Sequence, residues 1–320
     1  MTNHENTTQN IFQKIKEYRR ERKEKIAEMK NKELTFSEFV LDWLKNIAIA
    51  FIFITIINNL LIAQMRVPTG SMENTVMTGD FLFVNKIYGP STPQMIPFFN
   101  IPIPYIMLPS PSEPKRGDVI VFIFPGNRDE IEAREFQYYL KRCVAEPGDT
   151  LQLIDNELYV NGVFQPLPPQ GRLELDSNDN TNEIYTFPIS KRYSHKNYGP
   201  IRIPKKGDTI YFNSRTDFYD YKIFIEREGH SANWINGNAE INSKISKFYI
   251  VEQDYYFGMG DNRDNSSDSR YWGFIPRKAI LGSPIICWLS WGMYNADGSE
   301  CNIFQKIANI RWDRIGRTIS

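Results

Sequence analysis

The hexapeptide Val67-Pro68-Thr69-Gly70-Ser71-Met72 closely follows the only long apolar run of the sequence, at residues 47–63. Pro68 and Gly70 lie on either side of a hydroxyl residue. The fixed φ of proline and the conformational freedom of glycine predict an irregular backbone just before Ser71. A serine on such a loop beside a membrane anchor is a candidate nucleophile. An ordinary surface turn has the same composition, so the hypothesis needs a catalytic partner elsewhere in the chain.

Composition limits the classes of function. The chain has 320 residues, with 38 Lys and Arg against 38 Asp and Glu, so no overall field attracts nucleic acid. A high aromatic content and 19 prolines are typical of a β-rich protein with many turns. Three cysteines are too few for a disulfide framework. Cys287 and Cys301 would pair outside the cytoplasm, or all three cysteines, including Cys143, remain free thiols.

The N-terminal region predicts a tail followed by a membrane anchor. Residues 1–43 are rich in both charges and favour a solvated cytoplasmic helix, with contact to nucleic acid or anionic lipid as the alternative. Residues 44–64 are long and apolar enough to cross a bilayer once, and they lack a convincing signal-peptide cleavage site. Basic residues precede this segment, whereas only Arg66 and Lys86 occur between residues 63 and 114. The positive-inside rule therefore predicts a cytoplasmic N-terminus and an extracytoplasmic remainder.

Beyond the anchor the pattern predicts a mainly β fold. Residues 81–84 and 119–124 are short apolar runs typical of buried strands, and residues 158–163 predict a hairpin with an Asn-Gly turn. Gly-Asp turns at residues 117–118, 148–149 and 207–208 each open into a β-type run. Residues 95–109 are apolar but interrupted by prolines, which predicts a loop resting on the membrane surface.

A change of composition near residue 155 predicts the domain organisation. Residues 155–250 are more polar and richer in Asn, Ser and Tyr, so we interpret them as an inserted, smaller β-domain. The apolar pattern returns after residue 250. The antiparallel β core would then consist of two parts, residues 65–154 and 251–320.

A nucleophilic serine needs a base, and histidine is the usual one. The sequence has three histidines. His4 would lie across the membrane from Ser71, while His195 and His230 lie in polar, loop-like contexts.

Lysine can serve as the base when burial lowers its pKa. Lys141 lies in a β-type run at residues 138–145 and shares a strand face with Tyr139 and Cys143. Lowering its pKa from about 10.4 to about 8 would cost roughly 3 kcal/mol. An ordinary lysine at a strand edge is the alternative.

The last candidate segment is the loop at residues 258–273, Gly-Met-Gly-Asp-Asn-Arg-Asp-Asn-Ser-Ser-Asp-Ser-Arg-Tyr-Trp-Gly. Its density of turn residues and charges predicts a rigid, hydrogen-bonded loop. Residues 261–268 are similar in composition to a calcium-binding loop, but they lack its central glycine and terminal glutamate. The sequence contains no zinc-binding His-Glu-x-x-His motif and no phosphate-binding loop.

This loop resembles the Gly-Asp-Asn-Arg…Ser-x-Asp-Ser-Arg motif of the bacterial type I signal peptidases. The family's other motifs resemble residues 67–72, 117–122 and 139–149, in the right order. The resemblance covers residues 42 to about 280, with residues 155–250 similar only in general character. The tail at residues 310–316 is also similar to the end of the family.

The resemblance implies a signal peptidase-like fold and a Ser-Lys dyad. It implies Ser71 as nucleophile, Lys141 as general base, the Ser71 N–H and Thr69 hydroxyl as oxyanion donors, Ser266 as a hydrogen-bond partner of the lysine, and Asp268 and Arg270 as bracing residues. Two positions depart from the commoner pattern. Thr69 replaces a serine, and Asn74 stands where many members have proline.

The partners implied by the resemblance are preproteins, cleaved after small residues to remove their signal peptides. The substrate would bind as an extended strand at a sheet edge. At the bacterial inner membrane, we expect contact with membrane lipid and a nearby secretion translocon. We expect no nucleic acid partner, no cofactor and no metal. A self-cleaving Ser-Lys peptidase of the repressor type is one rival. The other is a membrane-anchored β-rich binding or assembly module without catalysis.

Overall fold

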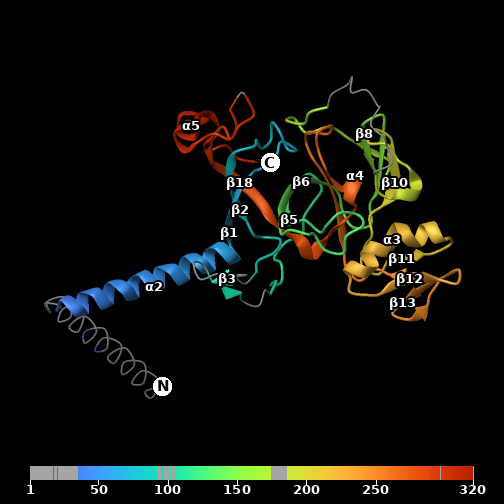
Figure 1. The fold of residues 1–320 in the computed structure, drawn as a ribbon, viewed down its shortest axis with the longest axis horizontal. Coiled ribbons are helices and arrows are strands. Elements are labelled where there is room, and N and C mark those ends of the chain that lie inside the picture. The colour runs from blue at the N-terminus through green and yellow to red at the C-terminus, as the bar shows by residue number, and fades with distance from the viewer. Residues whose placement is uncertain are drawn as a thin grey trace, which may run out of the picture. The chain divides into compact units, whose positions relative to one another are not determined.

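The computed structural model describes residues 17, 20, 35–91, 95–96, 101–102, 106–173, 186–295 and 297–319. Most of the predicted charged tail and part of the predicted apolar loop at residues 95–109 lie outside these residues. The chain divides into two compact units, residues 1–54 and 55–320. Figure 1 labels the main elements of both units.

Helix α2 (Phe36–Leu60) covers residues 44–60 of the predicted membrane segment. Its window at Phe36–Ile57 is long and apolar enough to cross a membrane. The helix does not share the bounds predicted for the membrane segment, 44–64. The helix begins earlier because Glu38 Oε2 accepts the Thr35 N–H at 3.0 Å while the Glu38 N–H donates to Thr35 Oγ1. It ends earlier because the chain turns into a strand at Ile62.

The second unit is built around a seven-stranded antiparallel sheet, which confirms the mainly β fold class. Its strand order is β1-β2-β18-β5-β6-β16-β17. The strands are β1 (Ile62–Arg66), β2 (Asp80–Asn85), β5 (Val119–Ile123), β6 (Tyr138–Ala145), β16 (Tyr255–Met259), β17 (Ile275–Pro276) and β18 (Ile280–Ser290). The predicted strands at 81–84 and 119–124 are confirmed as β2 and β5. Strands from before and after the insert pair with one another in this one sheet, β18 with β2 and β5, and β16 with β6.

The remaining strands form smaller sheets. β10 (Tyr198–Arg202), β7 (Thr150–Ile154), β8 (Glu157–Val160) and β9 (Val163–Gln165) form a four-stranded sheet in that order. β11 (Thr209–Tyr211) pairs with β15 (Phe248–Ile250), β12 (Ala232–Ile235) with β13 (Asn238–Ile241), β13 with β14 (Lys244–Ile245), and β3 (Met95–Ile96) with β4 (Ile101–Pro102). The predicted hairpin is confirmed, because β8 and β9 are joined by Asn161 and Gly162, both with positive φ.

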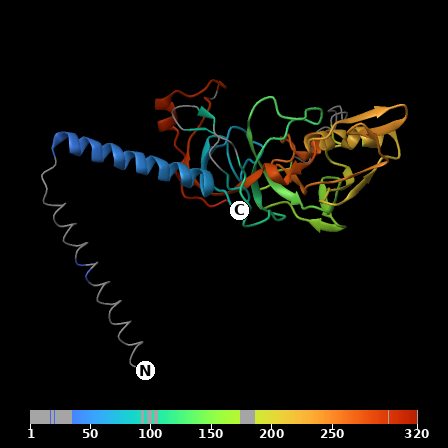
Figure 2. The same cartoon turned by 90° about the horizontal axis from the view of Figure 1, so that it is seen from below.

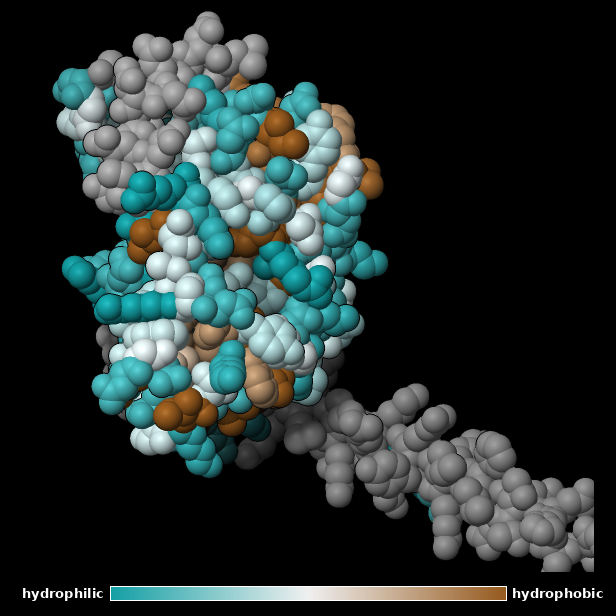
Figure 3. Space-filling view, turned by 90° about the vertical axis from the view of Figure 1, so that its right-hand side faces the viewer, coloured by the Kyte–Doolittle hydropathy of each residue, from teal (hydrophilic) through white to brown (hydrophobic). Residues whose placement is uncertain are grey.

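The insert contains a helix that the sequence analysis did not predict. α3 (Arg215–Arg227) begins after Ser214, whose side chain accepts the Asp217 N–H. It buries Phe218, Ile223 and Phe224 against neighbouring strands. The interpretation of residues 155–250 as a smaller β-domain did not include this helix. In Figures 1 and 2, α3 lies close to β11, β12 and β13, and this face is mostly hydrophilic with scattered apolar groups (Figure 3).

The boundaries of the insert stay a prediction. One hydrophobic cluster combines side chains of the insert with side chains of the core on either side of it in the sequence. It contains Leu151 and Tyr198 together with Phe257 and Phe274. The other short helices are α4 (Ser269–Trp272), α5 (Ile303–Ala308) and the 3-10 helices η2 (Ile189–Lys191), η3 (Arg277–Ala279) and η4 (Trp312–Arg314). All three cysteines are buried free thiols, so the pairing considered for Cys287 and Cys301 is not formed.

The predicted Gly-Asp turns share one geometry. In each, the glycine has positive φ and the aspartate side chain accepts the N–H three residues earlier, as in Asp118, Asp149 and Asp208. Gly79-Asp80 is a fourth copy that the sequence analysis missed, with Met77 N–H donating to Asp80 at 2.8 Å. These turns start strands because the aspartate closes the turn and the glycine accepts the left-handed backbone.

Candidate functional site

Ser71 lies on a tight turn whose neighbours are anchored in the core. The Glu73 N–H donates to the Gly70 carbonyl at 3.0 Å, and the Val76 N–H donates to the Met72 carbonyl at 2.8 Å. Met72 and Val76 are fully buried in the cluster that covers β2 and β5. Ser71 itself is half-buried, so its hydroxyl is held by a rigid backbone and still accessible.

The loop after β16 supports this turn from the other side. The Asn262 N–H donates to the Ser71 carbonyl at 3.1 Å, and the Asn262 side chain donates to the Gly70 carbonyl at 3.3 Å. Gly260 permits this approach, since a Cβ there would lie 2.4 Å from the Ser71 carbonyl oxygen. Asn262 was not among the predicted site residues, although it lies within the Gly-Asp-Asn-Arg string.

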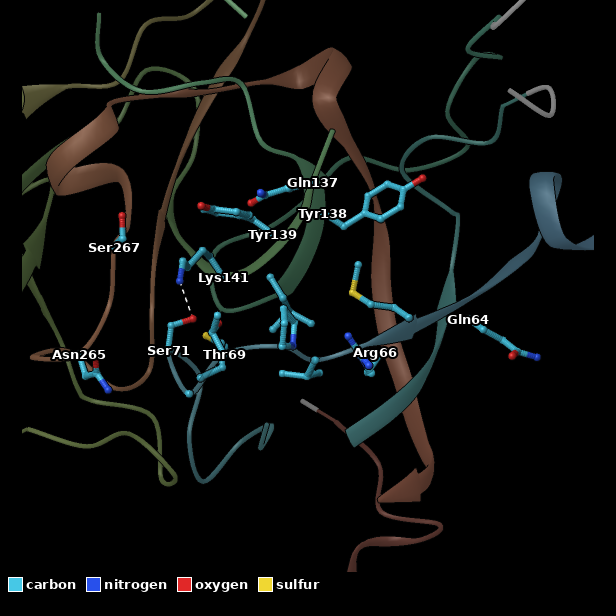
Figure 4. A pocket seen from close by; sticks show the side chains of 16 residues that line it. Gln64, Arg66, Thr69, Ser71, Gln137, Tyr138, Tyr139, Lys141, Asn265 and Ser267 are labelled. Atoms are coloured by element: carbon cyan, nitrogen blue, oxygen red, sulfur yellow. Dashed lines mark hydrogen bonds between the residues drawn. The ribbon is translucent and has the colours of Figure 1, made fainter. Parts of the chain in front are cut away.

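Lys141 lies in the middle of β6, opposite Ile120 of β5. Its side chain is almost completely buried, and its Nζ lies 2.6 Å from Ser71 Oγ. The Tyr139 ring, on the same strand face, lies 5.9 Å from the ammonium. Figure 4 shows the Lys141 and Ser71 side chains pointing toward one another. The structure thus brings together the two residues that the sequence analysis placed first.

Burial lowers the pKa of Lys141 to about 8. The charged form loses its hydration in this pocket, and the positive charge of Arg270 acts in the same direction. The carboxylates of Asp268 and Asp261 act against the shift. A lysine with such a pKa is partly uncharged near neutral pH, and an uncharged amine can accept the proton of the serine hydroxyl.

Asp268 and Arg270 form a buried ion pair beside the dyad. Arg270 Nε and Nη2 each lie 2.9 Å from an oxygen of the Asp268 carboxylate. Burial alone would raise the pKa of Asp268, but the Arg270 charge and hydrogen bonds bring it below its usual value. Asp268 also caps α4 and accepts the Gly260 N–H at 3.1 Å. The pair therefore fixes the loop that lies against Ser71.

Ser266 is buried next to the same loop, but its expected hydrogen bond to Lys141 is not formed. Among the described residues, Ser266 Oγ has no hydrogen-bond partner. The hydroxyl occupies the space left by the missing side chain of Gly260, 2.2 Å from where a Cβ would stand. The Lys141 amine is directed to Ser71 instead.

A second buried ion pair connects three parts of the site. Arg142 Nε and Nη2 donate to the two oxygens of Asp261 at 2.8 and 2.7 Å. The Thr75 hydroxyl donates to the same carboxylate at 2.5 Å. One carboxylate therefore joins β6, the loop after β16 and the loop of Ser71.

Ser71 and Lys141 face a cavity of about 710 Å³. Its walls are residues 64–72, residues 137–141, Asn265 and Ser267. Two strand edges border it. β1 pairs only with β2, and the part of β6 before Arg142 pairs with β5 but not with β16. Thr69 lies beside Ser71 in this cavity (Figure 4). Such edges can accept an extended peptide as an additional strand.

Comparison with known proteins identifies the family. Residues 40–291 match the family described as signal peptidase, peptidase S26. The chain belongs to this family. It is therefore a peptidase, which argues against the non-catalytic binding module.

Two relatives with similar sequences support the match. The chain is 31% identical to signal peptidase I of Buchnera aphidicola subsp. Acyrthosiphon pisum, over 83% of this chain and 79% of that protein. It is 29% identical to signal peptidase I of Aquifex aeolicus, over 79% of this chain and 88% of that protein. A crystal structure of a signal peptidase I from Enterococcus faecalis covers 54% of this chain and 97% of its own, with 23% identity and a TM-score of 0.24.

The described histidines lie apart from the Ser71 cavity. No histidine lines the cavity of Ser71 within the described ranges. His230 lies in the insert and bonds to Glu252 and Asn242, both at 2.8 Å. His4 lies outside the described residues. In the part of the chain that the structure describes, no cluster of three or more His, Cys, Asp or Glu side chains is placed to hold a metal ion.

Proposed function

We propose that this chain is a membrane-anchored serine endopeptidase that removes signal peptides from exported preproteins with a Ser71–Lys141 dyad. The observation that carries the proposal is the 2.6 Å contact between Lys141 Nζ and Ser71 Oγ, with the amine buried and its pKa lowered to about 8. Burial supplies a neutral amine near physiological pH, so the base does not have to be a histidine.

The acylation step follows from this geometry. Neutral Lys141 accepts the hydroxyl proton as Ser71 Oγ attacks the scissile carbonyl carbon. The resulting ammonium returns the proton to the leaving amine when the C–N bond breaks. A water molecule then attacks the acyl carbon while Lys141 accepts its proton. The bond from this carbon to Ser71 Oγ breaks, Oγ takes the proton from Lys141, and the product leaves with its new carboxyl end. At pH 7, roughly a tenth of a lysine population with this pKa is neutral, which is sufficient for general base catalysis.

The oxyanion would be stabilised by the Ser71 N–H and the Thr69 hydroxyl. Both belong to residues that line the cavity, where developing negative charge needs fixed donors. Threonine keeps the hydroxyl that serine would supply, and its extra methyl restricts the side-chain rotamer. Asp268, Arg270 and Ser266 would brace the loop against the dyad rather than contact the substrate.

The substrate would enter as an extended strand between the free edges of β1 and β6. Small residues at the first and third positions before the cleaved bond would fit beside Ser71. The anchor is part of the proposal, because β1 begins at Ile62 directly after α2 ends at Leu60. The cleft would therefore lie close to lipid and to the translocon, with the N-terminus in the cytoplasm and the peptidase unit outside the inner membrane.

The decisive experiment is cleavage of a purified preprotein by the full-length protein in detergent. Ser71→Ala and Lys141→Ala should each abolish cleavage while circular dichroism shows an unchanged fold. The chain offers a matched control, since Lys86 is also buried and donates to a buried serine, Ser91, at 2.8 Å. Lys86→Met and Ser91→Ala should retain cleavage per folded molecule.

Two results would contradict the proposal. Near-normal cleavage by either dyad variant would remove that residue from the mechanism. A loss in His230→Ala as large as in Ser71→Ala would restore histidine as the base.

A further inference from the structure

The last residues of the chain return to the central sheet. The segment at residues 310–319, here called the C-terminal arm, runs back along β18. Its backbone hydrogen bonds include Arg311 N–H to Ser290 at 2.9 Å, Gly316 N–H to Cys287 at 2.8 Å and Ile319 N–H to Ile285 at 3.1 Å. The family match ends at residue 291, so the arm lies beyond the matched part of the chain.

Two arginines of the arm reach the loop that carries Ser71. Arg314 is buried, and its Nε and Nη2 lie 3.0 and 2.6 Å from the oxygens of the fully buried Asp80. Its Nη2 also donates to the Thr75 carbonyl at 3.4 Å. Arg311 Nη2 donates to the Thr78 carbonyl at 2.6 Å. The arm therefore contacts the second half of this loop at three positions.

Asp80 is the point where the loop closes. Its carbonyl accepts the Val67 N–H at 2.9 Å, and the Gly79 N–H donates to the Val67 carbonyl at 2.9 Å. These two bonds join the ends of the loop at residues 67–80, which contains both Thr69 and Ser71. The Asp80 carboxylate also accepts the Ser290 hydroxyl at 2.7 Å. A change at Asp80 is thus transmitted to both ends of the loop.

We propose that the C-terminal arm positions the nucleophile, with Arg314 as the main positioning residue and Arg311 as a second one. This inference rests on the proposed Ser71–Lys141 function and extends it. Arg314 contacts the loop at Thr75 and Asp80, so it acts on Ser71 through the backbone of the loop. The loop is then held from two sides, by the arm at Asp80 and by Asp261 and Asn262 at the other side. Without the arm, Ser71 would lose its fixed distance to Lys141, and a displacement of about 1 Å can reduce a rate by about 100-fold.

The test compares Arg314→Lys with the full-length wild type in detergent, using steady-state cleavage of a preprotein. Lysine keeps the positive charge at Asp80 but cannot reproduce the planar fork or the additional bond to Thr75. We expect kcat to fall at least about tenfold and KM to change less than about twofold. The pH midpoint of kcat/KM should not move, because the surroundings of Lys141 stay intact.

Arg227→Lys is the matched control. Arg227 is similarly buried, and its guanidinium donates to the carbonyls of Gly126, Asn127 and Glu130, outside residues 67–80. Its substitution should lower the melting temperature while kcat stays within about twofold of wild type. If Arg314→Lys does not fold, Arg311→Lys gives the same readout, because that side chain is 25% exposed and tolerates change more easily.

The outcomes separate the two proposals. A folded Arg314→Lys variant with wild-type kcat overturns the positioning role, as does an equal loss of kcat in Arg227→Lys. Ser71→Ala in the same assay tests the underlying function. If Ser71→Ala still cleaves, the proposed function fails. If it is inactive while Arg314→Lys cleaves normally, only the role of the arm fails.

Discussion

Arg142 and Asp261 form a buried, bidentate ion pair directly beside the dyad. Arg142 follows Lys141 on β6 and points to the opposite face of the strand, where its guanidinium meets the Asp261 carboxylate at 2.8 and 2.7 Å. The same carboxylate accepts the Thr75 hydroxyl of the nucleophile loop. This charge pair therefore links the strand that carries Lys141 to the loop that carries Ser71.

Removing one member of this pair should strongly destabilise the protein. Asp261→Ala leaves the Arg142 charge buried without its carboxylate, and we expect the free energy of unfolding to fall by about 3–5 kcal/mol. The measurement is denaturant unfolding in detergent. The bidentate pair between exposed Arg202 and half-buried Asp208 is the control, and Arg202→Ala, which keeps the Asp208 turn, should cost about 1 kcal/mol or less. Equal losses in the two variants would contradict the importance of burial.

The rate should rise with pH through the pKa of Lys141. The neutral amine is the active form, and burial lowers the pKa of Lys141 to about 8, so kcat/KM should increase tenfold per pH unit below that value and level off above it. Lys141→Arg should be inactive at every pH, because a guanidinium stays protonated. A flat profile between pH 6 and 9 would show that another group limits the reaction.

The buried Lys141 should also lower the free energy of unfolding. Its folded-state pKa of about 8 lies below the ordinary lysine value of 10.5, so the folded state binds the proton more weakly. The penalty is complete below pH 8 and decreases as pH rises toward 10.5, above which both states are neutral. Lys141→Met should therefore raise the free energy of unfolding by up to about 3 kcal/mol at pH 7. Thermal unfolding at pH 7 and pH 10 measures this gain, which should be smaller at pH 10. A gain in stability that increases with pH would contradict a lowered pKa for Lys141.

Asn74 should not accept the proline that many relatives have at this position. Its φ is +75°, and proline requires a φ near −65°. We expect Asn74→Pro to lower the free energy of unfolding by more than about 1 kcal/mol, whereas Asn74→Gly should change it by less. Denaturant unfolding of both variants provides the comparison. A proline variant as stable as wild type would mean that the loop adopts another conformation.

Local patterns were sufficient for much of the fold. The strands at residues 81–84, 119–124 and 138–145 follow from short apolar runs, and the Asn161-Gly162 hairpin follows from its turn chemistry. α3 was missed for a physical reason. Its sequence is rich in aromatic and β-branched residues, which have strand propensity, and only burial of Phe218 and Phe224 against neighbouring strands favours the helix. The start of α2 was missed because it depends on the capping contacts of Thr35 and Glu38.

The sequence by itself determined which residue types were available for chemistry and which strand faces they occupy, because side-chain periodicity is a local property. Only the tertiary structure decided which of them meet. Lys141 reaches Ser71 across 70 residues and Arg314 reaches Asp80 across 234, since closure of one sheet from both parts of the chain sets these distances. Ser266 is a second example. Its motif predicts a hydrogen bond to Lys141, but packing places its hydroxyl in the space beside Gly260. Periodicity assigns a residue to a face, and packing between distant segments assigns it a partner.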